Sequence, residues 1–343
     1  MIPDISQESL SRWKALTDGA AKAVVLGHTH PDGDALGSCC ALAVYLQEKW
    51  GKQVHVVFPD SPADNLRFIV PASCRLVCQD TDPEGVGACI GACDLVFLLD
   101  CNGFSRTEGL EPLLREKDVP KILVDHHLNP ERDNFDLVFS TPDISSASEL
   151  LYWILTALDG GPGHLPAESA TALLAGMTTD TNNFANSVYP STFRMASELI
   201  AAGVDRDSLL QKLYNSYREN RVRIFGYMQL EGLRIVGEAA YMVLTRDIQR
   251  QFDIREGETE GLVNVPLSIA GVRLSLLLKE DDGHFRVSIR SKKGTSAQRL
   301  ASGYFHGGGH ENAAGGKLLV GADIASPAEA SAYVESALKS FLS

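Results

Sequence analysis

The sequence predicts an α/β protein whose N-terminal domain is built on a mostly parallel sheet flanked by helices. Four short apolar runs before residue 130 are continuous rather than alternating, as expected for strands buried on both faces of a parallel sheet. Helical stretches separate these runs, and this alternation is typical of the α/β class. The chain has 343 residues, more than one ordinary core accommodates, so we expect more than one domain.

The four predicted strands follow one another along the N-terminal half. The first covers 23–27 and leads through a loop into a helix over 35–50. The next three are the segment VHVVFPD and the ranges 94–102 and 121–127. The run S-A-S-E that ends at Glu149 is a capping box and predicts the start of a further helix. SATALLAGMTTD is predicted to form another helix.

A change of pattern near residue 236 divides the chain. We assign residues 1–190 to a first domain and residues 191–235, which are helical in pattern, to a connector. From 236 to 343, the segments AAYMVLTR, VRLSLLLKE, HFRVSIRSK and GKLLVGAD are predicted strands, and SPAEASAYVESALKSFL is a predicted last helix. These residues form a smaller C-terminal α/β domain.

The composition excludes several classes of protein. The net charge of −13 argues against a protein that coats long nucleic acid, because neutralising phosphates needs a broad basic surface. The sequence has no run of about 18 apolar residues and no signal peptide, so neither membrane binding nor secretion is expected. The seven cysteines lack C-x-x-C spacing and are expected to be buried, reduced thiols of a cytoplasmic protein.

Acidic residues and histidines follow predicted strands at four places. Taken singly, an aspartate after a strand is more often a turn residue or a helix cap. Taken together, such residues gather at one edge of a sheet, where carboxylates repel one another unless cations lie among them. Carboxylates with imidazoles suit Mn²⁺ or Mg²⁺, so we predict two such ions bridged by one carboxylate. The groups are His28, Asp32 and Asp34 in HTHPDGD, Asp100, Asp125-His126-His127, and Asp180 in GMTTDTNNF.

One segment of the C-terminal domain is locally basic. Residues 283–310 contain no acidic residue, and they end in a glycine-rich loop. One interpretation of this segment is a solvated edge strand whose lysines oppose aggregation. The adjoining glycines favour a phosphate site instead, because glycine lets backbone N–H groups approach a phosphate. The cations are Arg286, Arg290, Lys292, Lys293 and Arg299.

Together these motifs resemble the DHH phosphoesterase superfamily. The chain has H-x-x-x-D-x-D-x-x-G-S from His28, Asp100 after an apolar strand, D-H-H at 125–127 and T-D-T around Asp180. VSIRSK…LASGYFHGGGHENAAGG resembles the DHHA1 domain of that family. TDTNNFANSVYPSTFRMASELIAAGVD resembles the oligoribonuclease (nanoRNase) and pAp phosphatase branch. Five motifs in the family's order make this resemblance specific.

The resemblance implies a catalytic site with two divalent metal ions, Mn²⁺ preferred and Mg²⁺ possible. One ion would be held by His28 and Asp32, and the second by Asp34, His126 and Asp180. Asp100 would bridge the ions, and a water between them would be the nucleophile. The implied ligands are His28, Asp32, Asp34, Asp100, His126 and Asp180.

Further roles follow from the resemblance in the first domain. His127 would face the substrate phosphate, as a hydrogen-bond donor or general acid, and Asp125 would orient an imidazole. Arg106 would either contact the substrate or form a structural ion pair. His30 would lie behind the ligands or in solvent.

In the second domain, the resemblance implies contacts with the far phosphate of the substrate and with a base edge. The sequence departs from the family's pattern at His306, where a further glycine is usual. Either Lys292 or Lys293 would contact the phosphate. The implied substrate-binding residues are Arg290, Ser291, Lys292, Gly308, Gly309 and His310.

The implied activity is hydrolysis of phosphate esters in short oligoribonucleotides and in 3′-phosphoadenosine 5′-phosphate (pAp). One alternative is a phosphodiesterase for linear or cyclic dinucleotides such as pApA and c-di-AMP. Another is a non-catalytic RNA-binding module with a vestigial metal site. The GGGH segment argues against a family II inorganic pyrophosphatase. The expected partners are therefore small nucleotides or short RNA, and a homodimer is a further possibility.

Overall fold

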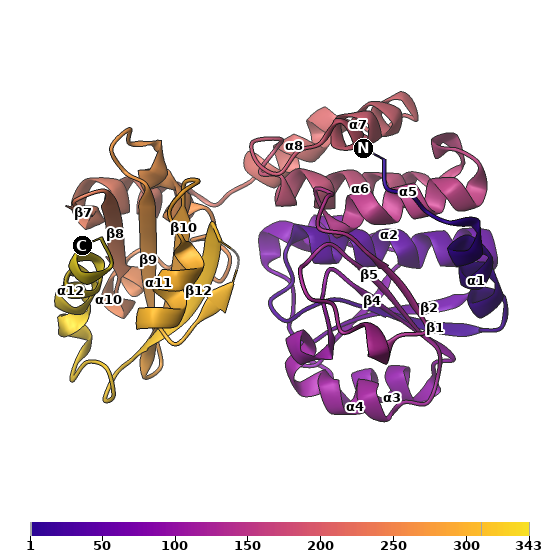
Figure 1. Cartoon of the computed structure of the whole chain (residues 1–343), viewed down its shortest axis with the longest axis horizontal. Coiled ribbons are helices and arrows are strands. Elements are labelled where there is room, and N and C mark those ends of the chain that lie inside the picture. The colour runs from indigo at the N-terminus through magenta and orange to yellow at the C-terminus, as the bar shows by residue number, and fades with distance from the viewer. Residues whose placement is uncertain (1, 310, 343) are drawn as a thin grey trace. The chain divides into compact units, whose positions relative to one another are not determined.

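The computed structural model describes residues 2–309 and 311–342, which divide into two compact units between Ser216 and Tyr217 (Figure 1). Both units combine a sheet with helices, which confirms the predicted α/β class.

The segment 191–235, expected to connect two domains, is divided by this boundary. Helices α7 (Pro190–Ala201) and α8 (Arg206–Tyr214) belong to unit 1. Helix α9 (Glu219–Tyr227) belongs to unit 2, and the segment ends in a short strand, β7 (Arg234–Val236).

Unit 1 is built on a six-stranded sheet in which all neighbouring strands are parallel, in the order β3-β2-β1-β4-β5-β6. This confirms the parallel sheet and the four predicted strands. Strands β3 and β6 were not predicted, because each contains an apolar run of only three residues. The strands are β1 (Lys22–Leu26), β2 (Gln53–Phe58), β3 (Arg75–Cys78), β4 (Leu95–Leu99), β5 (Lys121–Asp125) and β6 (Leu137–Ser140).

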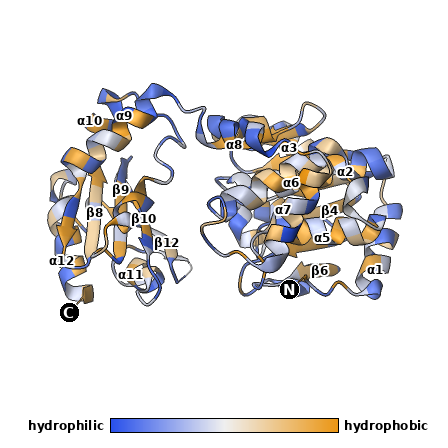
Figure 2. Ribbon diagram, turned by 90° about the horizontal axis from the view of Figure 1, so that it is seen from above, coloured by the Kyte–Doolittle hydropathy of each residue, from blue (hydrophilic) through white to orange (hydrophobic). Residues whose placement is uncertain are grey.

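Helices cover both faces of this sheet, with α2, α5 and α6 on one face and α3 and α4 on the other (Figure 1). Val25 and Phe97 point into the first core, and Val24 and Val96 point into the second. Burial on both faces explains why the strands are apolar throughout, and Figure 2 shows hydrophobic residues along α2 and α5 and hydrophilic ones on connecting loops. The helices are α1 (Gln7–Asp18), α2 (Gly33–Trp50), α3 (Pro83–Ala92), α4 (Glu111–Glu116), α5 (Ala147–Asp159) and α6 (Ala167–Asp180).

A close approach of α2 and α6 depends on glycine. A Cβ atom at Gly37 would lie 2.6 Å from the carbonyl oxygen of Ala172 and 2.9 Å from Cα of Gly176. A Cβ atom at Gly33 would lie 2.3 Å from Oγ1 of Thr179. The glycines of the D-G-D-x-x-G segment therefore let the start of α2 lie against the end of α6.

The predicted capping box at the start of α5 is formed only in part. The backbone N–H of Glu149 donates to Oγ of the N-cap residue Ser146 (3.0 Å), as predicted. The carboxyl group of Glu149 instead accepts from the backbone N–H of Ser145 (3.2 Å) and from its hydroxyl. It is therefore turned toward the residue that precedes the N-cap.

Unit 2 contains a second six-stranded sheet, in the order β11-β12-β10-β9-β8-β7. Its described strand pairs are antiparallel, except for the parallel pair β8 and β9. Leu300 and Val334 pack on one face, and Met228 and Leu262 belong to a separate core with Met242 of β8. The remaining elements are β8 (Ala239–Leu244), α10 (Arg246–Gln251), β9 (Leu274–Asp281), β10 (His284–Ser291), α11 (Ala297–Tyr304), β11 (Gly308–Gly309), β12 (Ala313–Leu319) and α12 (Ala330–Leu342).

The four predicted strands and the last predicted helix of this half are present as β8, β9, β10, β12 and α12. All seven cysteines are free, and only Cys74 is partly exposed. Within residues 2–309 and 311–342, no helix has the length and apolar character needed to cross a bilayer.

Candidate functional site

The predicted metal ligands lie where the strand order of unit 1 reverses. Strands β1 and β4 are neighbours in the sheet although β2 and β3 separate them in the sequence. Such a switch point is where open α/β sheets bind ligands, beyond the carboxyl ends of the strands. His28, Asp100 and His126 follow β1, β4 and β5, as the sequence predicted. The helix predicted for SATALLAGMTTD is confirmed as α6, and because Asp180 is its last residue, the prediction that Asp180 follows a strand is wrong.

His28, Asp32 and Asp100 form a first group, whose candidate ligand atoms lie within 4.8 Å of one another. Nε2 of His28 lies 3.9 Å from Oδ1 of Asp32 and 3.4 Å from Oδ2 of Asp100. Nδ1 of the same ring is 2.7 Å from the carbonyl oxygen of Thr29, an acceptor that leaves Nε2 facing the carboxylates. Asp32 is the N-cap of α2 and accepts two backbone N–H groups from its first turn.

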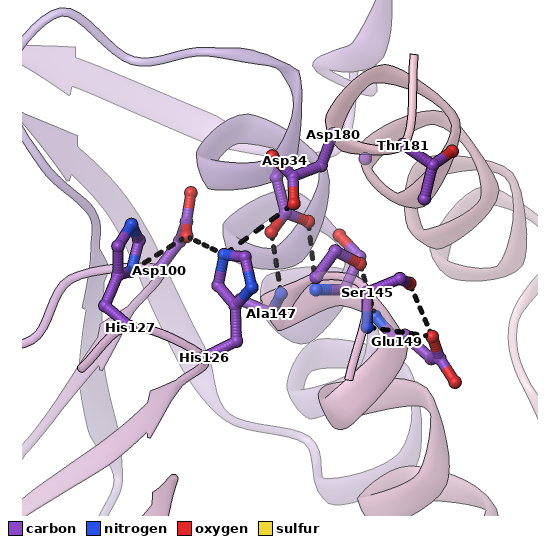
Figure 3. A network of polar contacts seen from close by, with 12 residues as sticks. Asp34, Asp100, His126, His127, Ser145, Ala147, Glu149, Asp180 and Thr181 are labelled. Atoms are coloured by element: carbon purple, nitrogen blue, oxygen red, sulfur yellow. Dashed lines mark hydrogen bonds and ion pairs between the residues drawn. The ribbon is translucent and has the colours of Figure 1, made fainter. Parts of the chain in front are cut away.

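Asp34, His126 and Asp180 form a second group, again with ligand atoms within 4.8 Å (Figure 3). Nε2 of His126 lies 3.7 Å from Oδ2 of Asp180 and 3.3 Å from Oδ1 of Asp100. Asp100 therefore contacts one imidazole of each group. This is the position that a bridging carboxylate would occupy.

Asp100 combines burial, an unusual backbone conformation and an unsatisfied oxygen. Its φ angle is +52°, in the left-handed region that residues other than glycine seldom adopt, and its side chain is buried. Its backbone N–H donates to the carbonyl oxygen of Val124 (3.0 Å), which ties the residue to β5. Within the described part of the chain, Oδ1 of Asp100 has no hydrogen-bond partner. Local strain and an orphaned buried oxygen are both characteristic of functional sites.

The crowding of charges shifts several pKa values. Burial, helped by the charge of Asp100, raises the pKa of Asp34 to about 7, and burial beside Asp34 raises the pKa of Asp180 well above its usual range. Burial opposes charge on His28 and His126, but their contacts with the negatively charged carboxylate of Asp100 outweigh it and raise their pKa values to about 9 and about 10. Burial would raise the pKa of Asp100, yet its contacts with the two imidazoles hold it far below its usual range.

This donor set fits divalent cations. In the metal-free chain the carboxylates are compensated by protons, and cations would replace those protons on binding. Imidazole nitrogen and carboxylate oxygen suit Mn²⁺ and Mg²⁺, and neither of these two ligand groups contains a cysteine. The buried Oδ1 atom of Asp100, without a hydrogen-bond partner among the described residues, is the observation that fits a bound cation best.

Three further residues form a chain of contacts beside Asp100. Nδ1 of His127 lies 2.8 Å from Oδ1 of the fully buried Asp125, whose other oxygen accepts the backbone N–H of His127 (3.0 Å). Nε2 of His127 lies 3.0 Å from Nη1 of Arg106. Arg106 forms no ion pair with any described residue, which favours the substrate-contact alternative over a structural ion pair. Asp125 thus orients His127, and His127 contacts the guanidinium.

In unit 2, Arg290, Ser291 and Lys292 come at the end of β10. Nη1 of Arg290 donates to the carbonyl oxygen of the adjacent Ile289 (2.9 Å), and no described carboxylate pairs with it. Burial lowers the pKa of Arg290. The hydroxyl of Ser291 donates to the carbonyl oxygen of Thr295 (2.6 Å), so it holds its own loop, and Nζ of Lys292 donates to a backbone carbonyl (3.1 Å).

The glycine-rich loop pairs with β12. Gly309 has a φ angle of +136°, and a Cβ atom at Gly307 would lie 2.0 Å from the carbonyl oxygen of Gly315. His306, where a glycine was expected, has a φ angle of +47°, and its Nε2 lies 2.9 Å from Oδ1 of Asp323. The predicted substrate contact His310 lies outside the described residues.

Sequence reasoning missed one acidic residue at the same edge of the sheet. Asp60 follows β2, and its Oδ2 accepts the backbone N–H of His30 (2.7 Å) and the hydroxyl of Thr29. It therefore holds the loop that carries His28. The signal was present, since VHVVFPD ends on an aspartate as other predicted strands do.

The sequence matches two family models, in the order expected. Residues 22–177 match the DHH family, N-terminal domain, and residues 238–337 match the DHHA1 domain. Together these matches cover most of the chain.

Similar proteins match over nearly their whole length. The bifunctional oligoribonuclease and PAP phosphatase NrnA of Thermus thermophilus is 30% identical over 298 residues, 85% of this chain and 82% of that protein. The protein of the same name in Bacillus subtilis is 27% identical over 85% of this chain and 87% of its own. An exopolyphosphatase-related protein from Bacteroides fragilis has a crystal structure with a TM-score of 0.91 and 33% identity, covering 99% of this chain and 98% of that one.

Proposed function

Because the chain belongs to the DHH family and also carries a DHHA1 domain, we propose that it is a metal-dependent phosphoesterase acting on short oligoribonucleotides and pAp. The relatives named oligoribonuclease and PAP phosphatase match both halves of the chain, which supports these substrates over pyrophosphate. The observation that carries the catalytic assignment is Asp100, buried between two groups of candidate ligands.

The proposed metal ligands are His28 and Asp32 at one site, Asp34, His126 and Asp180 at the other, and Asp100 at both. Two divalent cations held there would supply a hydroxide nucleophile at neutral pH and offset the charge of the phosphate. Mn²⁺ is the proposed ion, because two imidazoles among hard carboxylates favour a borderline cation.

The chain's own residues then bind and orient the phosphate. The contact with Asp125 keeps a proton on Nδ1 of His127, so Nε2 and the adjacent guanidinium of Arg106 are the polar groups available to the substrate. Arg106 binds a phosphate oxygen, and the neutral ring of His127 orients that guanidinium. To act as a general acid, His127 would first bind a second proton at Nε2 and would then donate that proton to the leaving oxygen.

In unit 2, Arg290 is the proposed cation for a second phosphate of the substrate, because no described carboxylate neutralises it. Lys292, Gly308 and Gly309 are proposed to contribute to the same binding site, with His310. Ser291 supports it through its loop.

Turnover of a substrate panel tests this proposal. The panel contains pAp, pApA, c-di-AMP, a five-nucleotide RNA, a twenty-nucleotide RNA and pyrophosphate, each with Mn²⁺, Mg²⁺ or EDTA. We expect pAp and the five-nucleotide RNA to be hydrolysed fastest with Mn²⁺, and no hydrolysis with EDTA. Preference for c-di-AMP or pApA would support the dinucleotide alternative, and metal binding without turnover would support the RNA-binding alternative. Sedimentation analysis distinguishes a homodimer from a monomer.

A further inference from the structure

A buried polar network lies directly behind the second group of candidate ligands (Figure 3). We propose that Glu149 is a positioning residue that sets the cation affinity of the Asp34, His126 and Asp180 group and not that of the other group. This inference rests on the metal requirement of the proposed function. It concerns cation binding, which is measured separately from hydrolysis.

The start of α5 holds the carboxylate of Asp34. The backbone N–H of Ala147 donates to Oδ2 (2.7 Å), and the backbone N–H of Ser148 donates to Oδ1 (2.9 Å). Both oxygens are thus fixed by the first turn of a helix, whose end carries partial positive charge. The orientation of Asp34 therefore depends on where α5 begins.

Glu149 determines where α5 begins. Its side chain is fully buried, and one oxygen accepts the backbone N–H of Ser145 (3.2 Å) and the Ser145 hydroxyl. The other oxygen accepts from Nε1 of Trp153 (3.3 Å), one turn further along α5. The carboxyl group thereby fastens the chain entering the helix to the helix itself.

The same carboxyl group reaches the segment that follows Asp180. The hydroxyl of Thr192, in the first turn of α7, donates to Oε2 of Glu149 (2.7 Å). The Thr192 oxygen also accepts the backbone N–H of Tyr189 (3.0 Å), which fixes the start of α7. The loop from the end of α6 to α7 is therefore anchored at its far end by Glu149.

Two carboxylate ligands of one group thus depend on a single residue behind them. Asp34 depends on it through the start of α5, and Asp180 through the loop that ends at α7. The other group has separate supports, since Asp32 caps α2 and Asp100 is tied to β5. Partners behind metal ligands typically change metal affinity by about 10–100-fold. We therefore expect substitution of Glu149 to lower the cation affinity of only one of the two sites.

The experiment is a Mn²⁺ titration of the metal-free full-length chain. Calorimetry measures the affinity of each site, and electron paramagnetic resonance counts the bound ions. The variants are Glu149→Ala, Glu149→Gln and Asp180→Asn, the last marking the signature of a lost second site. Tyr152→Phe is the matched control, because it removes a hydrogen bond between the same helix α5 and Glu198 without touching the ligands. Unfolding temperatures of the metal-free variants are recorded in parallel.

Wild type and Tyr152→Phe should bind two ions. Glu149→Ala should keep one site at its wild-type affinity and weaken the other at least tenfold, with an isotherm like that of Asp180→Asn. Glu149→Gln should recover part of the loss, because its amide oxygen still accepts. If Glu149→Ala does not fold, Thr192→Val should show the same selective loss to a smaller extent.

Two unchanged affinities in Glu149→Ala, or equal weakening at both sites, would overturn the positioning role. Binding of fewer than two ions by the wild type would overturn it as well. If two ions bind selectively as described but no nucleotide is hydrolysed, the proposed function fails while the positioning role stands.

Discussion

The two units present opposite charges at the residues proposed to act. In unit 1, Asp34, Asp100 and Asp180 are crowded together, and Asp100 is left with an oxygen that no described donor satisfies. In unit 2, Arg290 is left with no described carboxylate. The difference favours a cation as the ligand of these carboxylates in unit 1 and an anion as the ligand of Arg290 in unit 2. Changes at these carboxylates should therefore alter metal binding, and a change at Arg290 should alter substrate binding alone.

The largest effect is expected from Asp100→Asn. Asparagine tolerates a φ angle of +52° as well as aspartate does, so the fold should be kept. Loss of the bridging charge should lower kcat by more than about a hundredfold, beyond the range seen for residues behind a ligand. Steady-state hydrolysis of pAp and Mn²⁺ titration measure this. Asp118→Asn, at an exposed position, is the control and should leave both unchanged. Full activity of Asp100→Asn would exclude the bridging role.

Acid should weaken cation binding by the next largest amount. The raised pKa values of His28 (about 9) and His126 (about 10) mean that both rings carry a proton at pH 7 in the metal-free chain. Cations need neutral imidazoles, so binding releases both protons and affinity falls as the pH falls. One pH unit, from 8 to 7, should cost at least about a hundredfold in overall affinity for the pair of ions, about tenfold for each imidazole proton released, and protons released from Asp34 and Asp180 add to this. Calorimetry in buffers of different ionisation enthalpy counts the protons. Cation binding without proton release would contradict the prediction that contacts with Asp100 keep both imidazoles protonated.

Arg290→Ala tests the other side of the comparison. Removal of a charged hydrogen-bond donor should raise KM for pAp by about tenfold or more, as expected for loss of about 1.5–3 kcal/mol. The count and affinity of bound Mn²⁺ should stay at wild-type values. Arg286→Ala is the matched control, because that cation is already paired with Glu256 at 3.0 Å. A change in Mn²⁺ affinity without a change in KM would show that the division between the units is wrong.

The smallest effect is expected at His306, next to the glycine-rich loop. His306→Gly loses an exposed ion pair with Asp323, worth about 0.2–1 kcal/mol, but relieves a φ angle of +47°. His306→Ala loses the pair and keeps the strain. The alanine variant should therefore unfold at a lower temperature than the glycine variant, by an amount equivalent to about 1 kcal/mol. The reverse order in thermal unfolding would show that the left-handed conformation carries no cost here.

Much of the fold could be predicted because its signals are local. The strands β1, β4 and β5 are continuous apolar runs, and their burial on both faces leaves no alternative pattern. Strands β3 and β6 were not predicted, because their apolar runs of three residues are too short to distinguish a strand from other structure. Asp180 was assigned to a strand end although the helix predicted for SATALLAGMTTD ends on it, because an apolar stretch before an aspartate fits a buried strand as well as a buried helix.

The sequence by itself determined the α/β class, the switch-point motifs and the chemical type of the ligands, because residue types and spacing follow the chain. Only the tertiary structure decided how those ligands are held. The contacts of Asp34 with α5, of Glu149 with Thr192 and of Asp60 with the loop after β1 join residues far apart in sequence. Hydrogen bonds of this kind depend on distance in space, and no local pattern records them.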